Sequence, residues 1–223
     1  MSDSTAGLPG TVPLFPLPLV LFPDGRLPLH IFEPRYRQML GDIMAGNRTF
    51  GLIGSDSGAA APRPGAIGCL AVVESATRLP DGRSNIVVRG TQRFEVLTIS
   101  SEGTPYLTAA IAPVSDDPQT NALLGDAAAE LRALVQRVSQ AARAIAEQPI
   151  GDLELPDDPH QLSFAVAQAI DLELSVKQSL LASRDPLARL RHLRELLGRI
   201  LAPLEARAAA HDRARSNGHG PPA

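Results

Sequence analysis

Hydrophobic and polar residues alternate along the first half of the chain and recur at helical spacing along the second half. Residues 26–32 alternate strictly, with leucine or isoleucine at every second position, which is typical of a strand with one face on a core. The period changes at Glu33-Pro34, and proline is well tolerated at the first position of a helix. The sequence therefore predicts a helix over Pro34–Ala45, with Gly46 as a left-handed residue after its end. The apolar residues expected to pack on the strands are Tyr36, Met39, Leu40 and Ile43.

An apolar run rich in proline, Val12–Pro23, precedes this strand and helix. Proline lacks a backbone donor, so the run cannot form a long helix or a central strand, and we expect an extended edge strand with bends. Asp24-Gly25 then has the composition of a turn.

Further short apolar segments separated by turn residues follow. Pro80-Asp81-Gly82 predicts the tight turn of a hairpin. Short strands of this number, mostly antiparallel, usually close into a small barrel or sandwich. We expect a small, mostly antiparallel β-barrel with the helix inserted early. The expected strands are Arg48–Gly54, Ala66–Leu79, Asn85–Gly90, Phe94–Ser100 and Tyr106–Val114.

Beyond Pro113 the pattern becomes helical, so the fold class is α+β with a C-terminal α-helical bundle. A long helix is expected over Thr120–Gln148, and Asp158 is expected to cap the next helix. Ser175 and Gln178 suggest a capping box for a short helix over Val176–Ser183, and Asp185-Pro186 opens the last helix. The expected domains are a flexible N-terminus (1–10), a β-rich domain (11–115), a helical domain (118–206) and a disordered tail (207–223).

Composition narrows the classes of function. Aromatic residues make up only 4% of the chain and tryptophan is absent, so the core must be aliphatic. The net charge of −3 argues against nucleic acid and anionic membranes as partners. The N-terminal residues do not have the pattern of a secretory signal, and the longest apolar run is too short to span a bilayer. Cys69 is the only cysteine, which fits a cytoplasmic protein, and its apolar surroundings predict a buried, inert thiol.

Residues for catalysis are not evident. The single lysine, Lys177, has no glycine-rich loop before it, so it does not form a phosphate-binding P-loop. The five histidines lack a second histidine or cysteine at the spacing of a metal site. We therefore expect no enzyme activity, no metal and no cofactor.

Three members of a group of polar residues flank the junction between the alternating strand and the helix, and its two other members are arginines on either side of Gly90. We expect the group to be a structural ion network in which Glu33 pairs with Arg89 or Arg93, and a ligand site is the alternative. The members are His30, Glu33, Arg35, Arg89 and Arg93.

The string LFPLPLVLFPDGRLPLHIFEPRYRQML resembles the N-terminal, substrate-binding domain of the Lon proteases, which also occurs alone in small bacterial proteins. Later segments agree in the same order, namely RTFGLIG, LPDGR, VVRGTQRFEV, PYLTAAI and SVKQSLLAS. The resemblance covers about Thr11 to Leu204 and implies a PUA-like, Lon N-domain-like barrel followed by helices. It also implies a recognition domain, with the ATPase and the serine–lysine protease in other domains.

The function expected from this resemblance is the binding of unfolded or flexible polypeptide segments, with components of a protease as further partners. A small-molecule or nucleic-acid binding barrel is the alternative. Exposed apolar loops often mark partner sites, so the loop Leu19–Pro23 is the candidate surface, although the same loop could instead fold onto the core. The residues expected to bind polypeptide are Leu19, Leu21, Phe22 and Phe32.

Overall fold

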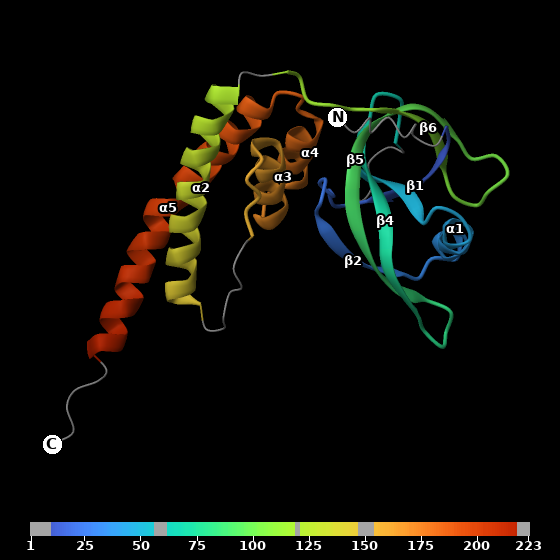
Figure 1. Ribbon diagram of the computed structural model, residues 1–223. Coiled ribbons are helices and arrows are strands. Elements are labelled where there is room, and N and C mark those ends of the chain that lie inside the picture. Colours follow the sequence, from blue (N-terminus) through green and yellow to red (C-terminus); the bar gives the residue numbers. More distant parts are fainter. Residues whose placement is uncertain (1–9, 56–61, 119–120, 147–153, 218–223) are drawn as a thin grey trace. The chain divides into compact units, whose positions relative to one another are not determined.

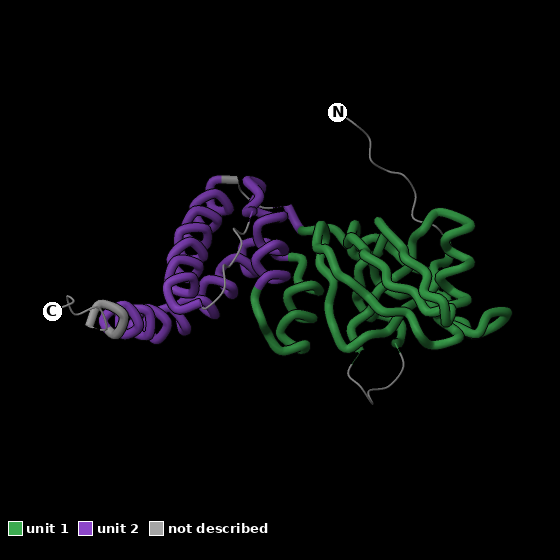
Figure 2. Tube along the Cα trace, turned by 90° about the horizontal axis from the view of Figure 1, so that it is seen from below, with its two compact units in different colours: residues 1–116, 170–184 green, residues 117–169, 185–223 purple. Residues whose placement is uncertain are grey.

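The computed structural model describes residues 10–55, 62–118, 121–146 and 154–217 (Figure 1). The chain divides into two compact units (Figure 2). Unit 1 contains Met1–Asp116 together with Ile170–Arg184, and unit 2 contains Asp117–Ala169 together with Asp185–Ala223. Residues 170–184 therefore differ from the expectation, which assigned them to the helical domain.

Unit 1 is built on a mixed six-stranded sheet in the order β2-β5-β4-β3-β1-β6. The strand β5 also pairs with β6, so the pairings from β5 through β4, β3, β1 and β6 return to β5. Only β1 and β3 pair in parallel, and the other pairings are antiparallel. The strands are β1 (Val12–Leu17), β2 (Arg26–Ile31), β3 (Thr49–Gly54), β4 (Ile67–Arg78), β5 (Ser84–Ser100) and β6 (Thr108–Pro113).

The proline-rich strand β1 is not an edge strand, which corrects the expectation. Its first residues, Val12 and Pro13, pair with β6, and residues 14–17 then pair with β3. Because each neighbour pairs with only part of β1, the strand needs fewer donors than a central strand paired on both sides along its length. Prolines are therefore accommodated inside the sheet.

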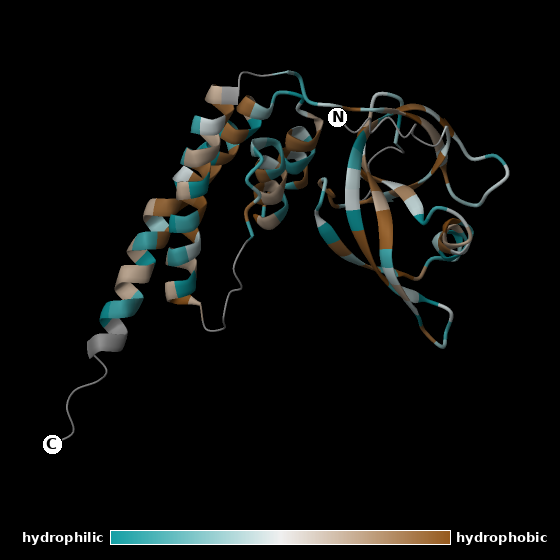
Figure 3. Cartoon of the chain, viewed as in Figure 1, coloured by the Kyte–Doolittle hydropathy of each residue, from teal (hydrophilic) through white to brown (hydrophobic). Residues whose placement is uncertain are grey.

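The strand β5 is continuous where the sequence predicted two strands. It runs through Gly90 and pairs with β4 on both sides of this glycine, whereas its other edge has two different partners. The first half pairs with β2, for example His30 with Asn85, and the second half pairs with β6. Buried and exposed positions alternate along most of β5, and the apolar residues can be followed along β4 and β5 in Figure 3.

The helix α1 (Pro34–Met44) lies beside the sheet in Figure 1. Its expected packing residues are all buried, and they share one core cluster with β3, β4 and the first half of β5. The chain turns after the helix at Arg48 (φ +60°) rather than at Gly46, whose φ is not positive. The buried residues of α1 are Tyr36, Met39, Leu40 and Ile43.

The helix α4 (Leu174–Ala182) belongs to unit 1 because polar side chains join it to the sheet. Gln178 donates from Nε2 to the carbonyl oxygen of Ile67 at 2.8 Å. The expected capping box of Ser175 and Gln178 is therefore wrong. Glu173 precedes the helix without a side-chain cap, and Gln178 binds β4 instead.

Unit 2 contains α2 (Asn121–Ile145), α3 (Pro159–Ala169) and α5 (Pro186–Asn217), and α2 lies alongside α5. Asp158 and Asp185 cap α3 and α5 as expected, accepting backbone N–H bonds of 2.9 and 3.0 Å. Residues 207–217 are helical, so the expected disordered tail is wrong for them. The expected flexible N-terminus and residues 218–223 lie outside the described residues, except for Gly10.

Candidate functional site

The loop Leu19–Pro23 folds onto the core, which is the alternative that the sequence left open, and this corrects the expectation that Leu21 and Phe22 bind polypeptide. Leu21 and Phe22 are fully buried, and Leu19 is half-buried against the core. Leu21 and Phe22 therefore anchor the loop and cannot contact a partner directly.

The absence of a side chain at Gly90 explains why the loop lies flat. A Cβ at this position would overlap the backbone oxygen of Phe22. The loop and β5 also exchange two backbone hydrogen bonds, from Asp24 N to Gly90 O at 3.0 Å and from Gly90 N to Gly25 O at 2.9 Å. The turn itself has its positive φ at Asp24 (61°).

An apolar and aromatic surface remains at the end of β2. Pro28 and His30 are exposed, and Phe32 is 58% exposed, one of the few large hydrophobic side chains at the surface. The rings of His30 and Phe32 stack with centroids 6.0 Å apart, and His30 Nδ1 lies 2.7 Å from Asn85 Oδ1. We call Pro28, His30 and Phe32 the β2 outer surface. Among the described strands, β2 pairs only with β5, so its other edge is free.

The expected ion network is divided among separate contacts, so Glu33 does not reach Arg89 or Arg93. Glu33 binds Arg35, two residues further on, at 2.8 Å. Arg89 instead reaches Glu74 at 3.2 Å and Asp24 at 3.4 Å.

Arg26 also binds Glu74, at 2.9 Å, and lies opposite Arg89 in the β2–β5 ladder. A hydrogen bond from Arg26, followed by the charges of both arginines, lowers the pKa of Glu74. This carboxylate therefore stays ionised between two like charges on the sheet.

Arg93 has a purely internal position. Its side chain is 3% exposed, and its Nη2 binds Asp116 at 2.5 Å. Its Nη1 donates to the carbonyl oxygens of Leu181 and Ser183, at 2.8 and 2.6 Å. Since these carbonyls end α4, the guanidinium also compensates the negative end of that helix. Arg93 is therefore a structural residue of unit 1.

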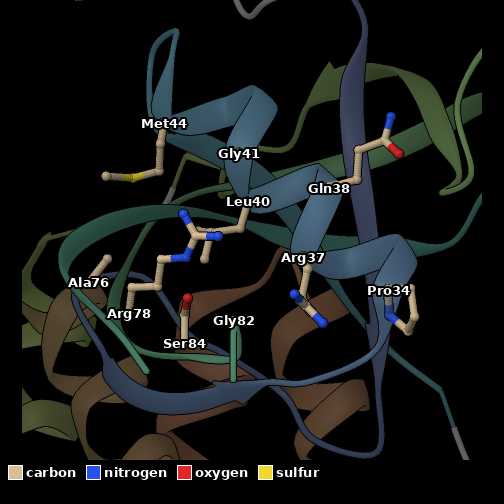
Figure 4. A pocket seen from close by; sticks show the side chains of 10 residues that line it. All are labelled: Pro34, Arg37, Gln38, Leu40, Gly41, Met44, Ala76, Arg78, Gly82 and Ser84. Carbon is tan, nitrogen blue, oxygen red and sulfur yellow. The ribbon is translucent and has the colours of Figure 1, made fainter. Parts of the chain in front are cut away.

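A cavity of about 630 Å³ lies between α1 and the hairpin formed by β4 and β5 (Figure 4). Arg37 extends from α1 towards Gly82, and Arg78 extends from β4 towards α1. None of the described residues that line the cavity is acidic. We call it the α1–hairpin cavity. It is lined by Pro34, Arg37, Gln38, Leu40, Gly41, Met44, Ala76, Arg78, Gly82 and Ser84.

Arg37 and Arg78 were not predicted as a pair from the sequence. Arg37 lies off the apolar stripe of its helix, and Arg78 lies two residues before the hairpin turn. Each reads as an ordinary exposed charge. Only the packing of α1 beside the hairpin brings them to one cavity, and the turn at Pro80-Asp81-Gly82 is the one local signal of that hairpin.

The described residues offer little reactive chemistry. Burial raises the pKa of Cys69 to about 12, so its thiol stays protonated at neutral pH. Across the described ranges, no group of three or more histidine, cysteine, aspartate or glutamate side chains could hold a metal ion. None of the helices in these ranges is long and apolar enough to cross a membrane.

The chain is similar to known proteins over most of its length. The profile of a family described as the ATP-dependent protease La (LON) substrate-binding domain matches residues 11–199. Lon protease 1 of Herpetosiphon aurantiacus is 27% identical over 213 residues, covering 91% of this chain and 26% of that protein. Lon protease of Desulfosudis oleivorans is 29% identical over 215 residues, covering 92% and 26% respectively. The chain thus spans about a quarter of the length of these curated relatives.

Two solved structures share the fold. The Lon N-terminal domain protein from Xanthomonas campestris has a TM-score of 0.60 at 24% identity, covering 82% of this chain and 96% of that chain. The N-terminal domain of Mycobacterium avium complex Lon protease has a TM-score of 0.67 at 20% identity, covering 84% and 98%.

Proposed function

Because the chain belongs to the family of Lon substrate-binding domains, we propose that it is a recognition module for flexible or unfolded segments of other polypeptides. The observation that carries this proposal is the β2 outer surface. Phe32 is 58% exposed beside the stacked His30 ring, at the end of a strand with a free edge. Exposed apolar side chains next to a free strand edge suit an extended chain, which can use both.

The proposed contact is tolerant of sequence. An aromatic ring packs against many apolar side chains, whereas a buried polar network would select one. Burying a phenylalanine side chain contributes roughly 1.5–3 kcal/mol, so a single such contact gives weak binding. We expect micromolar or weaker affinity for unfolded chains. Leu19 is half-buried and is not required, while Leu21 and Phe22 act by holding the loop on β5.

The scaffold supports the same interpretation. We propose that the pairings that return to β5 close the sheet of unit 1 into the small barrel indicated by the sequence, and that α2, α3 and α5 form the helical bundle. A closed sheet leaves few free edges, which would make the edge of β2 a distinct feature of the surface.

The test is titration of a labelled, permanently unfolded protein against the wild type and Phe32→Asp. We expect Phe32→Asp to weaken binding by roughly tenfold, since a charge replaces the apolar contact. Leu97→Asp is the matched control, because Leu97 is 49% exposed on β5 and lies outside the proposed surface. Circular dichroism and urea unfolding check the fold of each variant. Equal weakening in both variants, or none in Phe32→Asp, would contradict the proposal.

A further inference from the structure

Two arginines, Arg37 and Arg78, line the α1–hairpin cavity, and Asp81 in the adjacent turn offsets the charge of Arg37 only in part, because it is shared with Arg83. Neither Arg37 nor Arg78 has a hydrogen bond or an ion pair with another side chain in the described part of the chain. Asp81 forms its ion pair with Arg83 at 2.6 Å, and the more distant charge of Arg37 adds to the lowering of the Asp81 pKa. Five other arginines of unit 1 bind carboxylates, namely Arg26, Arg35, Arg83, Arg89 and Arg93, whereas Arg48 and Arg63 form no ion pair among the described residues but lie outside the cavity lining.

The geometry keeps the two guanidinium groups at the cavity. Arg37 lies over Gly82, where a Cβ would overlap its guanidinium, and Gly82 has a φ of +81° that glycine adopts without strain. Arg78 comes from the opposite wall and shares its ladder position with Ser84 on β5. Bound carboxylates would reduce the electrostatic repulsion between two positive charges that face the same cavity. Guanidinium groups bind carboxylates with paired N–H donors.

The rest of the lining suits a peptide. Leu40 keeps 8% of its surface exposed and Met44 is half-buried, and both line the cavity, so they offer apolar contact beside the arginines. A volume of about 630 Å³ lies within the usual range for ligand sites.

Backbone groups are also available next to the cavity. The ladder between β3 and β4 ends at Val72, and among the described strands the residues from Ser75 to Arg78 pair only with β5. A free strand edge can hydrogen-bond an extended chain.

We propose that the α1–hairpin cavity binds an acidic stretch of the client polypeptide, in which two aspartate or glutamate side chains engage Arg37 and Arg78. This inference rests on the proposed function and adds a charge preference to it. Two cations on opposite walls match two carboxylates within a segment, whereas a chain terminus carries only one. An aliphatic residue of the same segment would contact Leu40 and Met44.

The test uses three labelled peptides of equal length and the full chain. The first is neutral and apolar with blocked ends, the second has an internal pair of glutamates with blocked ends, and the third is the neutral peptide with a free carboxyl terminus. We expect the second peptide to bind roughly tenfold more tightly than the first, with a preference that falls as salt is raised.

Arg37→Gln and Arg78→Gln should each reduce this preference by roughly threefold, and the double variant should abolish it. Arg63→Gln is the matched control, because it removes one exposed arginine before β4, outside the cavity lining. Circular dichroism and unfolding in urea verify that all variants remain folded.

The outcomes separate the two proposals. Equal binding of the neutral and the glutamate peptide overturns the charge preference and leaves the recognition function standing. A preference that survives in the double variant, or that follows the free carboxyl terminus, also overturns it. If no peptide binds to the wild type, the recognition function falls and the inference falls with it.

Discussion

Single polar side chains join segments of unit 1 that lie far apart in the sequence. The Tyr106 hydroxyl, in the connection before β6, donates to Asp42 Oδ2 on α1 at 2.8 Å. Tyr106 is only 6% exposed, and burial, followed by the Asp42 carboxylate, raises its pKa to about 12. Arg93 has a similar role for α4. Both contacts are specific enough to be tested by one substitution each.

Tyr106→Phe should lower the free energy of unfolding by about 1–2 kcal/mol at pH 7, because it removes one hydrogen bond to a charged acceptor. The protonated phenol is the form that the fold stabilises, since its pKa rises from 10.0 to about 12 on folding. This contribution is complete below pH 10 and is lost as the pH rises from 10 towards 12.

Urea unfolding from pH 7 to 11 tests this prediction. The difference between wild type and Tyr106→Phe should shrink above pH 10. The raised pKa of Cys69 affects both proteins equally and cancels in the comparison. A difference that stays constant over the whole pH range would contradict the proposed linkage.

Arg93→Met should destabilise unit 1 by about 3–5 kcal/mol, because it removes a buried guanidinium that binds the carboxylate of Asp116 and two carbonyls at the end of α4. Arg89→Gln is the matched control on the same strand. Its ion pairs are at the surface, so about 0–1 kcal/mol is expected. Unfolding in urea measures both, and equal losses would show that the burial of Arg93 contributes nothing.

Sequence alone could not assign these partners. Glu33 and Arg35 are close in sequence, but Arg89 meets Glu74 only because of the β4–β5 register and its bulge near that residue. Arg93 binds residues up to 90 positions away. Side-chain pairing of this kind depends on register and on long-range packing, which a local pattern does not contain.

At the scale of secondary structure, the sequence was most informative where each junction had its own signal. The helix α1 follows a strictly alternating strand and begins with proline, and its buried stripe was predicted correctly. By contrast, β5 was divided at Gly90, because a glycine within a strand resembles a break. Folding of the loop Leu19–Pro23 onto the core was one of two alternatives, but its contact with Gly90 was not predicted, since the glycine lies 68 residues from Phe22 in the chain.

Met39→Ala tests the packing of α1. Met39 is 1% exposed in the core cluster, so its truncation should cost roughly 2–5 kcal/mol of unfolding free energy. Gln38→Ala, at an exposed position of the same helix, should change stability by about 0.5 kcal/mol or less. Equal stability of the two variants in denaturant would place this face of α1 outside the core.

For the whole molecule, we expect that the purified chain hydrolyses neither ATP nor peptides. Its single lysine, Lys177, lies on α4 without a phosphate-binding loop, and Cys69 is buried. Nucleotide turnover and cleavage of a labelled unfolded protein are the measurements. Activity that survives repurification and disappears on mutation of a residue of this chain would contradict the expectation.

The position of Arg93 also bears on how this chain can vary in length. The chain leaves unit 1 after Asp116 and returns to it at Ile170. The guanidinium of Arg93 binds both Asp116 and the end of α4. A single side chain of unit 1 thus fixes both the point where the chain leaves this unit and the helix that follows its return. The entropy of closing a loop grows only slowly with length, by about 0.6 kcal/mol for each doubling. Insertions or deletions between Asp117 and Ala169 should therefore change the free energy of unfolding of unit 1 only slightly. Replacement of Arg93 itself should not be tolerated.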